Sequence, residues 1–224
     1  MNASDHAGHR VAWLMLVMGL AVMGALFVLV TKGMVRGLDS GHPVEYLQSS
    51  CIAGAIVLSI LPILRILDLV SLPYWFVALL CGDVYYFILS LCLGLYLDVT
   101  WWGDVAHSIT AAIVASTVFV ALCVVQARSP PHVALGRKGG IVTMTFLAGG
   151  AFGGIWEILE GYTDTLVGEA YMSYGAWDTL GDLRADLVGL VAATAIAWLV
   201  LRKREPEQVS SGVKVGRKAV RGRL

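Results

Sequence analysis

Six long apolar runs constrain this chain most strongly, because each is long enough to cross a lipid bilayer. An α-helix rises 1.5 Å per residue, so about 20 apolar residues span the hydrocarbon core. Hydrophobic residues make up 58% of the chain and charged residues only 14%. We therefore predict an all-α polytopic membrane protein, with about six transmembrane helices in a compact bundle, at residues 11–30, 44–68, 73–96, 104–125, 141–160 and 182–201.

The segments outside these runs define the expected domain organisation. Residues 1–201 are predicted to form a single transmembrane domain, in which residues 161–181 form a long loop. The first run is too long for a signal peptide and has no small-residue cleavage site after it, so we count it as a span. Residues 202–224 are basic and contain Gly and Ser, and we expect a disordered tail there.

The distribution of basic residues predicts the orientation. Six spans place both termini on the same side of the membrane, and the positive-inside rule selects that side. With both termini cytoplasmic, the inside segments hold 13 Lys and Arg residues and the outside loops hold three. This count predicts a multi-pass membrane protein with both termini cytoplasmic.

An aspartate ladder marks the beginning of the last run. Asp178, Asp182 and Asp186 follow one another at intervals of four residues, so a helix places them on one face over about 12 Å. Gly189 and Ala193 continue this face with small side chains. Carboxylates entering hydrocarbon are costly, so we expect the face to point into protein or a water-filled cavity.

The two preceding runs carry ionisable residues at the same predicted side of the membrane. Asp104 and His107 open the fourth run, whereas Glu157 and Glu160 close the fifth. Small residues follow the polar positions in each run, and small residues let membrane helices approach closely. These ionisable side chains are therefore predicted to converge between the last three helices.

Several acids around one histidine require a compensating cation or shared protons, because like charges repel. Carboxylate and imidazole ligands suit zinc, manganese or iron, whereas mainly carboxylate ligands suit magnesium or calcium. The candidate ligands of a divalent metal ion are His107, Glu157, Asp182 and Asp186. Glu157 and Asp186 are also the candidate catalytic residues. The expected supporting residues are Asp104, Glu160 and Asp178.

Three motifs carry these residues: Trp101-Trp-Gly-Asp-Val-Ala-His107, Trp156-Glu-Ile-Leu-Glu160 and Trp177-Asp-Thr-x-x-Asp-x-x-x-Asp-x-x-Gly189. Their order resembles the YjdF family of small bacterial inner-membrane proteins and, more distantly, VanZ-like proteins. The resemblance covers about residues 50–200, and its most specific part is the Trp-Asp-Thr block. Gly103, Ala176 and Gly181 depart from the expected acidic or polar residues. The resemblance implies a bacterial inner-membrane location and supplies no established reaction.

Two classes of function fit this pattern. The first is a membrane-embedded, metal-dependent hydrolase acting on a lipid-linked or envelope substrate, with a metal-bound water as nucleophile and a carboxylate as general base. The second is a non-enzymatic transporter, channel or assembly protein whose acids bind a cation or relay protons. The same residues would also suit helix capping and interhelical hydrogen bonds. Membrane lipids are the expected partners, and no motif indicates nucleic-acid binding; the oligomeric state stays open.

Overall fold

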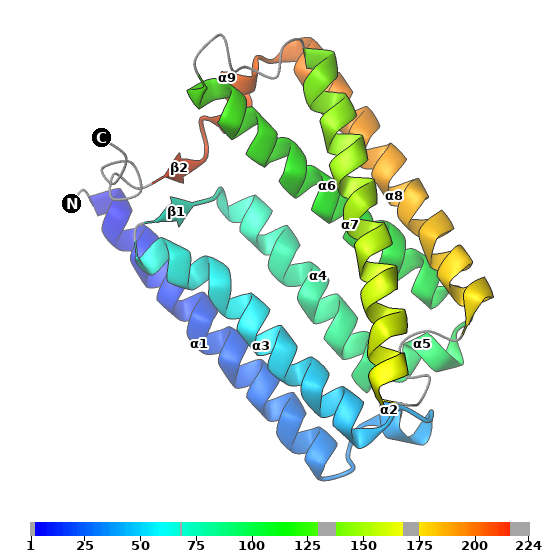
Figure 1. Cartoon of the computed structure of the whole chain (residues 1–224). Helices are drawn as coiled ribbons and strands as arrows, with labels where there is room; N and C mark the ends of the chain where they lie inside the picture. The colour runs from blue at the N-terminus through cyan, green and yellow to red at the C-terminus, as the bar shows by residue number, and fades with distance from the viewer. Residues whose placement is uncertain (1–2, 68, 130–137, 168–174, 216–224) are drawn as a thin grey trace. The chain divides into compact units, whose positions relative to one another are not determined.

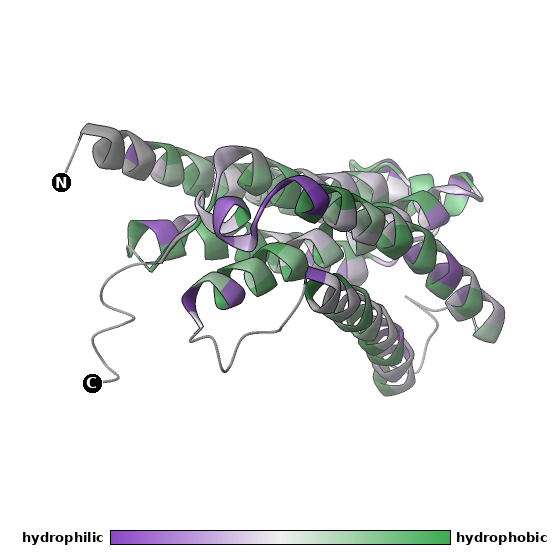
Figure 2. Cartoon of the chain, turned by 90° about the horizontal axis from the view of Figure 1, so that it is seen from above, coloured by the Kyte–Doolittle hydropathy of each residue, from purple (hydrophilic) through white to green (hydrophobic). Residues whose placement is uncertain are grey.

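The chain is an all-α polytopic membrane protein. A computed structural model describes residues 3–67, 69–129, 138–167 and 175–215 (Figure 1). Within these residues, five helices are long and apolar enough to cross a membrane, and a shorter apolar helix occupies the place of the third expected span. Apolar residues cover most of the length of these helices (Figure 2). Each of the six predicted runs thus contains a helix.

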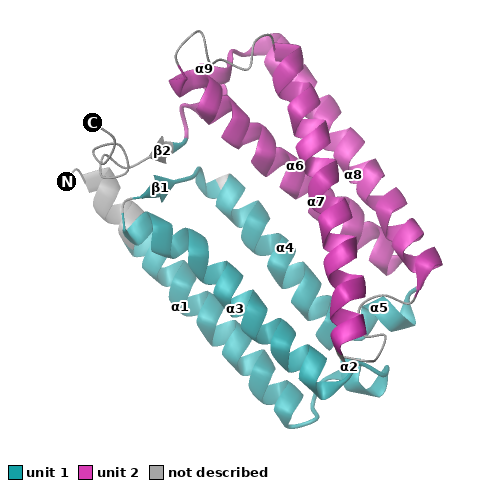
Figure 3. Cartoon of the chain, in the orientation of Figure 1, with its two compact units in different colours: residues 1–99, 213–224 teal, residues 100–212 magenta. Residues whose placement is uncertain are grey.

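Two compact units make up the chain (Figure 3). The first comprises Met1–Val99 together with Val213–Leu224, and the second comprises Thr100–Gly212. Every residue of the candidate metal centre belongs to the second unit. The candidate metal centre therefore lies entirely within the second unit.

Three long helices form the first unit: α1 (Ala3–Thr31), α3 (Val44–Ile66) and α4 (Tyr74–Cys92). Their buried contact surface includes Met23, Leu47, Cys51, Ile88 and Cys92. The cysteines at these positions are free thiols, as expected for packing residues. The smaller elements are α2 (Arg36–Asp39), α5 (Leu95–Asp98) and strand β1 (Val70–Ser71), which pairs antiparallel with β2 (Lys214–Val215).

The third expected span ends earlier than predicted. The sequence predicted a helix to residue 96, but α4 ends at Cys92 and the separate short helix α5 follows. Gly94 adopts a left-handed backbone with φ of 73°, which glycine tolerates best, and this conformation interrupts the helix. A Cβ at Gly94 would also collide with the side chain of Ser40.

Helices α6 (Trp102–Arg128), α7 (Lys138–Val167) and α8 (Ala176–Lys203) form the second unit with the short helix α9 (Pro206–Ser210). The three long helices lie side by side (Figure 1). Ala115, Leu190 and Ala193 form a buried contact at mid-length. A second core, near α9, comprises Phe119, Cys123, Ile141, Ala197 and Leu201.

The expected loop at residues 161–181 is largely helical where the structure describes it. Helix α7 continues to Val167 and α8 begins at Ala176, while residues 168–174 lie outside the described residues. At 30 residues, α7 is about 45 Å long and therefore exceeds the hydrocarbon core of about 30 Å. The predicted span ended at residue 160 because the residues after it are more polar. The backbone of α7 nevertheless remains helical through these last turns.

The start of α6 also differs from the prediction. The fourth run was predicted to begin at residue 104, but α6 begins at Trp102, so Trp101 occupies the N-cap position and Asp104 lies in the first turn. Its carboxylate is exposed. A carboxylate in the first turn still complements the positive end of the helix dipole.

The segment after α8 is partly ordered, whereas the sequence predicted a disordered tail from residue 202. Glu205 and Gln208 form a reciprocal capping box around the start of α9. The Nζ atom of Lys138 on α7 donates a hydrogen bond to Glu205 Oε1 at 2.7 Å. The Glu205 side chain at the start of α9 thus contacts α7, while α9 itself packs against α6. Residues 216–224 lie outside the described residues.

Candidate metal centre

Close packing of α6 against α8 determines where the polar residues meet. The Ser108 hydroxyl on α6 donates a hydrogen bond to the Ala185 carbonyl oxygen on α8 at 2.9 Å. Gly189, one turn further along α8, lies so close to the Ser108 carbonyl that a Cβ there would overlap it. Glycine thus permits the approach that brings the first turns of α6 and α8 together.

His107 lies at the centre of the candidate site and faces acids from both neighbouring helices. Its Nδ1 atom is 3.3 Å from Asp186 Oδ1, and its Nε2 atom is 3.6 Å from Asp182 Oδ1. Glu157 on α7 also approaches Nδ1, with Oε1 at 4.0 Å from that nitrogen. The structure therefore brings together all four residues that the sequence proposed as metal ligands.

Glu157 is the most deeply buried acid of this group. Its side chain is 4% exposed, compared with 18% for His107 and 14% for Asp182. Both carboxylate oxygens of Glu157 are buried without a hydrogen-bond partner. A buried carboxylate without hydrogen bonds is costly, so this position favours a bound cation or a proton as the missing partner.

Three of the residues could bind one metal ion through one ligand atom each. The ligand atoms of His107, Glu157 and Asp182 all lie within 4.8 Å of one another. Metal–ligand distances of about 2.0–2.2 Å bring the ligand atoms of a tetrahedral site to roughly 3.5 Å from one another. The observed grouping would thus need only a modest contraction, by rotation of side chains, to enclose an ion.

Asp186 differs from these three residues in its surroundings. It faces Nδ1 of His107 and is not part of the group of converging ligand atoms. Its second oxygen, Oδ2, packs against Gly153 of α7, where an added Cβ would lie only 2.5 Å away. The carboxylate of Asp186 consequently lies in a space that exists because residue 153 has no side chain.

The predicted supporting residues surround the cluster at different depths. Glu160 is buried and lies three residues beyond Glu157 on α7. Asp178 is half-buried and lies one turn before Asp182 on α8, whereas Asp104 is exposed at the start of α6. None of these three belongs to the group of converging ligand atoms.

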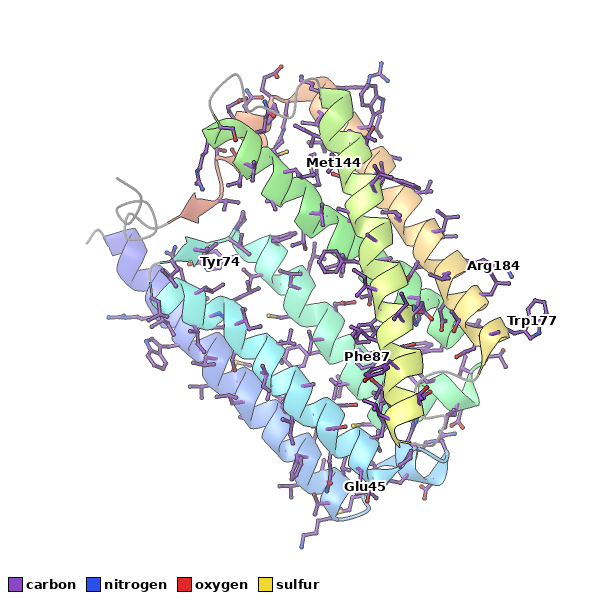
Figure 4. The ribbon with its side chains drawn as sticks, in the orientation of Figure 1. Glu45, Tyr74, Phe87, Met144, Trp177 and Arg184 are labelled. Atoms are coloured by element: carbon purple, nitrogen blue, oxygen red, sulfur yellow. The ribbon has the colours of Figure 1, made fainter. Side chains whose placement is uncertain are left out.

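The basic residue nearest in sequence does not neutralise the acids. Arg184 is exposed and points away from the bundle on the outer side of α8, as does Trp177 (Figure 4). Two residues after Asp182 on a helix, Arg184 lies about 200° around the axis from it. The acids thus face His107 with no contribution from the Arg184 guanidinium.

The sequence missed one part of the packing behind the site. It placed small residues beside the acids of α7 without specifying which of them pack against neighbouring helices, and Gly154 has no neighbouring atom within 4 Å of an added Cβ. Gly149 instead packs against Leu190 and Ala115. The spacing of four residues between Gly149 and Gly153 was the signal that identifies this face.

Comparison with known families agrees with the membrane architecture. The family model described as predicted membrane protein (DUF2238) matches residues 14–203, which are most of the chain and include His107, Glu157, Asp182 and Asp186. The chain belongs to the DUF2238 family. Searches of curated proteins and of solved structures found no match. The family description states a membrane location and names no reaction.

Proposed function

We propose that this DUF2238 protein binds a divalent metal ion through His107, Glu157 and Asp182 and acts as a membrane-embedded, metal-dependent hydrolase. The observation that carries the proposal is the Glu157 carboxylate, buried without a hydrogen-bond partner beside two further ligand-type side chains. A divalent ion would supply the missing partner for Glu157. Two ligand carboxylates would also balance its charge within a low-dielectric environment.

The donor set favours a transition metal over magnesium or calcium. One imidazole and two carboxylates resemble the ligand sets that bind zinc, manganese or iron, and three protein ligands leave a coordination position for water or substrate. When bound, such an ion supplies a Lewis acid and lowers the pKa of a coordinated water. The protein residues would hold the ion, exclude bulk water and orient the imidazole.

The substrate is proposed to be a lipid-linked or envelope compound. His107 and Asp182 retain partial exposure, so the cluster is reachable from their side, whereas Glu157 forms its buried wall. Trp101, Trp156 and Trp177 are exposed on the three helices that supply the cluster. Exposed tryptophans suit the membrane interface, where an amphiphilic substrate would present its polar group.

The proposed location is the bacterial inner membrane with both termini cytoplasmic. The excess of basic residues on the predicted inside segments supports this orientation, and the resemblance to the YjdF family supports the membrane assignment. The candidate metal centre would then face the extracytoplasmic side of the membrane. A reporter that is active only outside the cytoplasm should be active after Gly168 and inactive after Leu224.

A direct test of hydrolysis uses the full chain in lipid nanodiscs. Wild-type protein would be incubated with a panel of lipid esters, lipid phosphates and lipid-linked envelope precursors, with product release followed by mass spectrometry. We expect turnover that a chelator abolishes, that added zinc or manganese restores, and that Glu157→Gln lacks. Metal-independent turnover, or turnover retained in Glu157→Gln, would contradict the proposal.

Proton or cation transfer is the second candidate function. It is favoured by the position of His107, whose two ring nitrogens face different acids and could pass a proton between them. This candidate predicts pH-gradient-dependent flux in proteoliposomes without turnover of any lipid substrate. Chelator-sensitive hydrolysis without flux would instead support the hydrolase.

A further inference from the structure

We propose that Asp186 is a positioning residue, which fixes the tautomer of His107, and that Gly153 provides the space in which its carboxylate lies. This inference rests on the proposed metal centre and refines it. Asp186 would not bind the ion. It would hold the imidazole so that Nε2 is available to the ion beside Asp182.

The two ring nitrogens of His107 face different acids. With Asp186 ionised, its carboxylate can only accept a hydrogen bond, so Nδ1 donates to Asp186 Oδ1, which lies 3.3 Å away, and Glu157 Oε1 lies 4.0 Å from the same nitrogen. In a neutral imidazole the other nitrogen, Nε2, then carries the lone pair. Nε2 is the nitrogen that lies nearest to Asp182, at 3.6 Å. The ligand-type nitrogen therefore points toward a predicted ligand carboxylate.

Asp186 lies outside the group of converging ligand atoms. Although Asp186 is the acid nearest to His107, the grouping of ligand atoms consists of His107, Glu157 and Asp182. A carboxylate on the far nitrogen of a metal-binding histidine is a common outer partner of metal sites, and it fixes both the tautomer and the ring orientation. The arrangement around His107 has this form.

The carboxylate of Asp186 packs against α7 at Gly153. Its Oδ2 atom faces Gly153 of α7, and an added Cβ at that position would lie 2.5 Å from Oδ2 and 3.4 Å from Cγ. Such contacts would displace the carboxylate rather than the backbone, because Oδ2 is the free end of a side chain. Gly153→Ala should therefore disturb the hydrogen bond between Asp186 and His107 while α7 and α8 remain packed.

The test begins with nitrogen NMR on full-length protein containing ¹⁵N-labelled histidine, without metal. The His107→Gln variant assigns the His107 signals. We expect wild type to show a protonated Nδ1 and an unprotonated Nε2, and Asp186→Ala to shift toward the other tautomer. Asp186→Asn, whose amide oxygen can still accept a hydrogen bond, should largely retain the wild-type tautomer. Gly153→Ala should shift it, whereas Gly154→Ala, whose Cβ would meet nothing within 4 Å, should not.

The second readout loads the same variants with Co²⁺ and measures binding and the visible absorption spectrum. Asp186→Asn should bind roughly 10–100-fold more weakly, as expected for an outer partner, with an unchanged spectrum because no ligand is lost. Asp182→Asn should lose stoichiometric binding. A changed spectrum or lost stoichiometry in Asp186→Asn would make Asp186 a ligand and overturn the inference.

The two readouts separate failure of this inference from failure of the proposed function. If wild type binds no Co²⁺, the metal centre fails, while the tautomer comparison still decides whether Asp186 positions His107. If metal binds but the tautomer is the same in wild type, Asp186→Ala and Gly153→Ala, the positioning role is wrong. Should Asp186→Ala fail to fold, Asp186→Asn and Gly153→Ala still provide the comparison.

Discussion

Gly189 of α8 lies directly against Ser108 of α6, because a Cβ built on Gly189 would overlap the Ser108 carbonyl oxygen and lie 3.1 Å from the Ala112 backbone nitrogen. The obstacles at Gly189 are backbone atoms, which cannot rotate away as a side chain can. The contact therefore determines the distance between the two helices that supply His107, Asp182 and Asp186.

Gly189→Ala should destabilise the protein by about 1–3 kcal/mol, the usual cost of overpacking a tight interior. It should also weaken metal binding, because α6 and α8 would move apart at the site. Unfolding in detergent and metal titration would measure the two effects. Gly154→Ala on α7 is the matched control, since its Cβ would meet nothing within 4 Å. Equal stability of the two variants would show that the contact is looser than described.

Glu157→Gln should stabilise the metal-free protein while eliminating metal binding. The substitution keeps the side-chain volume and removes a charge that is buried without a hydrogen-bond partner. Thermal unfolding with and without metal would show the crossover: a higher Tm than wild type in chelator and no response to added metal. Glu45→Gln serves as the control, because Glu45 is an exposed carboxylate at the start of α3 (Figure 4). If Glu157→Gln instead has a lower Tm than wild type in chelator, the Glu157 carboxylate has an additional stabilising partner in the metal-free protein, which would contradict this prediction.

Substitutions within the cluster should be non-additive. If His107, Glu157 and Asp182 hold one ion, losing any one of them removes most of the affinity, so a second loss adds little. The Glu157→Gln, Asp182→Asn double variant should then bind metal scarcely more weakly than either single variant. Isothermal titration of the four proteins would test this, and losses that add in free energy would favour separate structural roles.

Much of this site could be predicted from the sequence, because hydrocarbon tolerates few ionisable groups. His107, Glu157 and Asp182 lie at one predicted end of three apolar runs, and small residues continue each face, so convergence between the helices followed. The sequence could not predict which ring nitrogen of His107 faces Asp182 and which faces Asp186. It depends on side-chain rotamers and on helix rotations that residue spacing does not specify.

The helix ends were harder to predict than the spans. Hydropathy reports where a helix enters hydrocarbon, but α7 and α8 extend beyond that boundary into the segment expected to be a loop. The break at Gly94 is different, because a glycine inside an apolar run is compatible with a continuous helix. At Gly94 the backbone is left-handed and packs against Ser40, a contact distant in sequence that residue spacing does not reveal.

The first unit should lose stability as the pH falls below neutral, through His42. Burial lowers the pKa of His42 from its ordinary value of 6.5, and the negative charge of Asp98 offsets this only in part. The unfolded chain therefore takes up a proton at a higher pH than the folded protein does. The corresponding stability is present above pH 6.5 and decreases as the pH falls from there through the lower folded-state pKa.

His42→Phe should reduce this acid sensitivity, because phenylalanine keeps an aromatic ring beside Tyr46 and does not titrate. The measurement compares Tm at pH 7.5 with Tm at successively lower pH for both proteins in the same detergent. The wild-type protein should lose more stability than the variant. Parallel pH profiles would assign the sensitivity to other groups.

Metal content of the purified protein tests the central proposal most directly. Full-length wild type, Asp182→Asn and Asp104→Asn would be purified in detergent without chelator, exposed to equal zinc, manganese and iron, freed of unbound ions and measured by elemental analysis. Asp104 is exposed at the start of α6 and outside the ligand group, so it is the matched control. We predict about one equivalent of a single metal in wild type and Asp104→Asn, and none in Asp182→Asn. Wild-type protein that retains no metal, or equal metal in all three proteins, would contradict a metal centre at His107, Glu157 and Asp182.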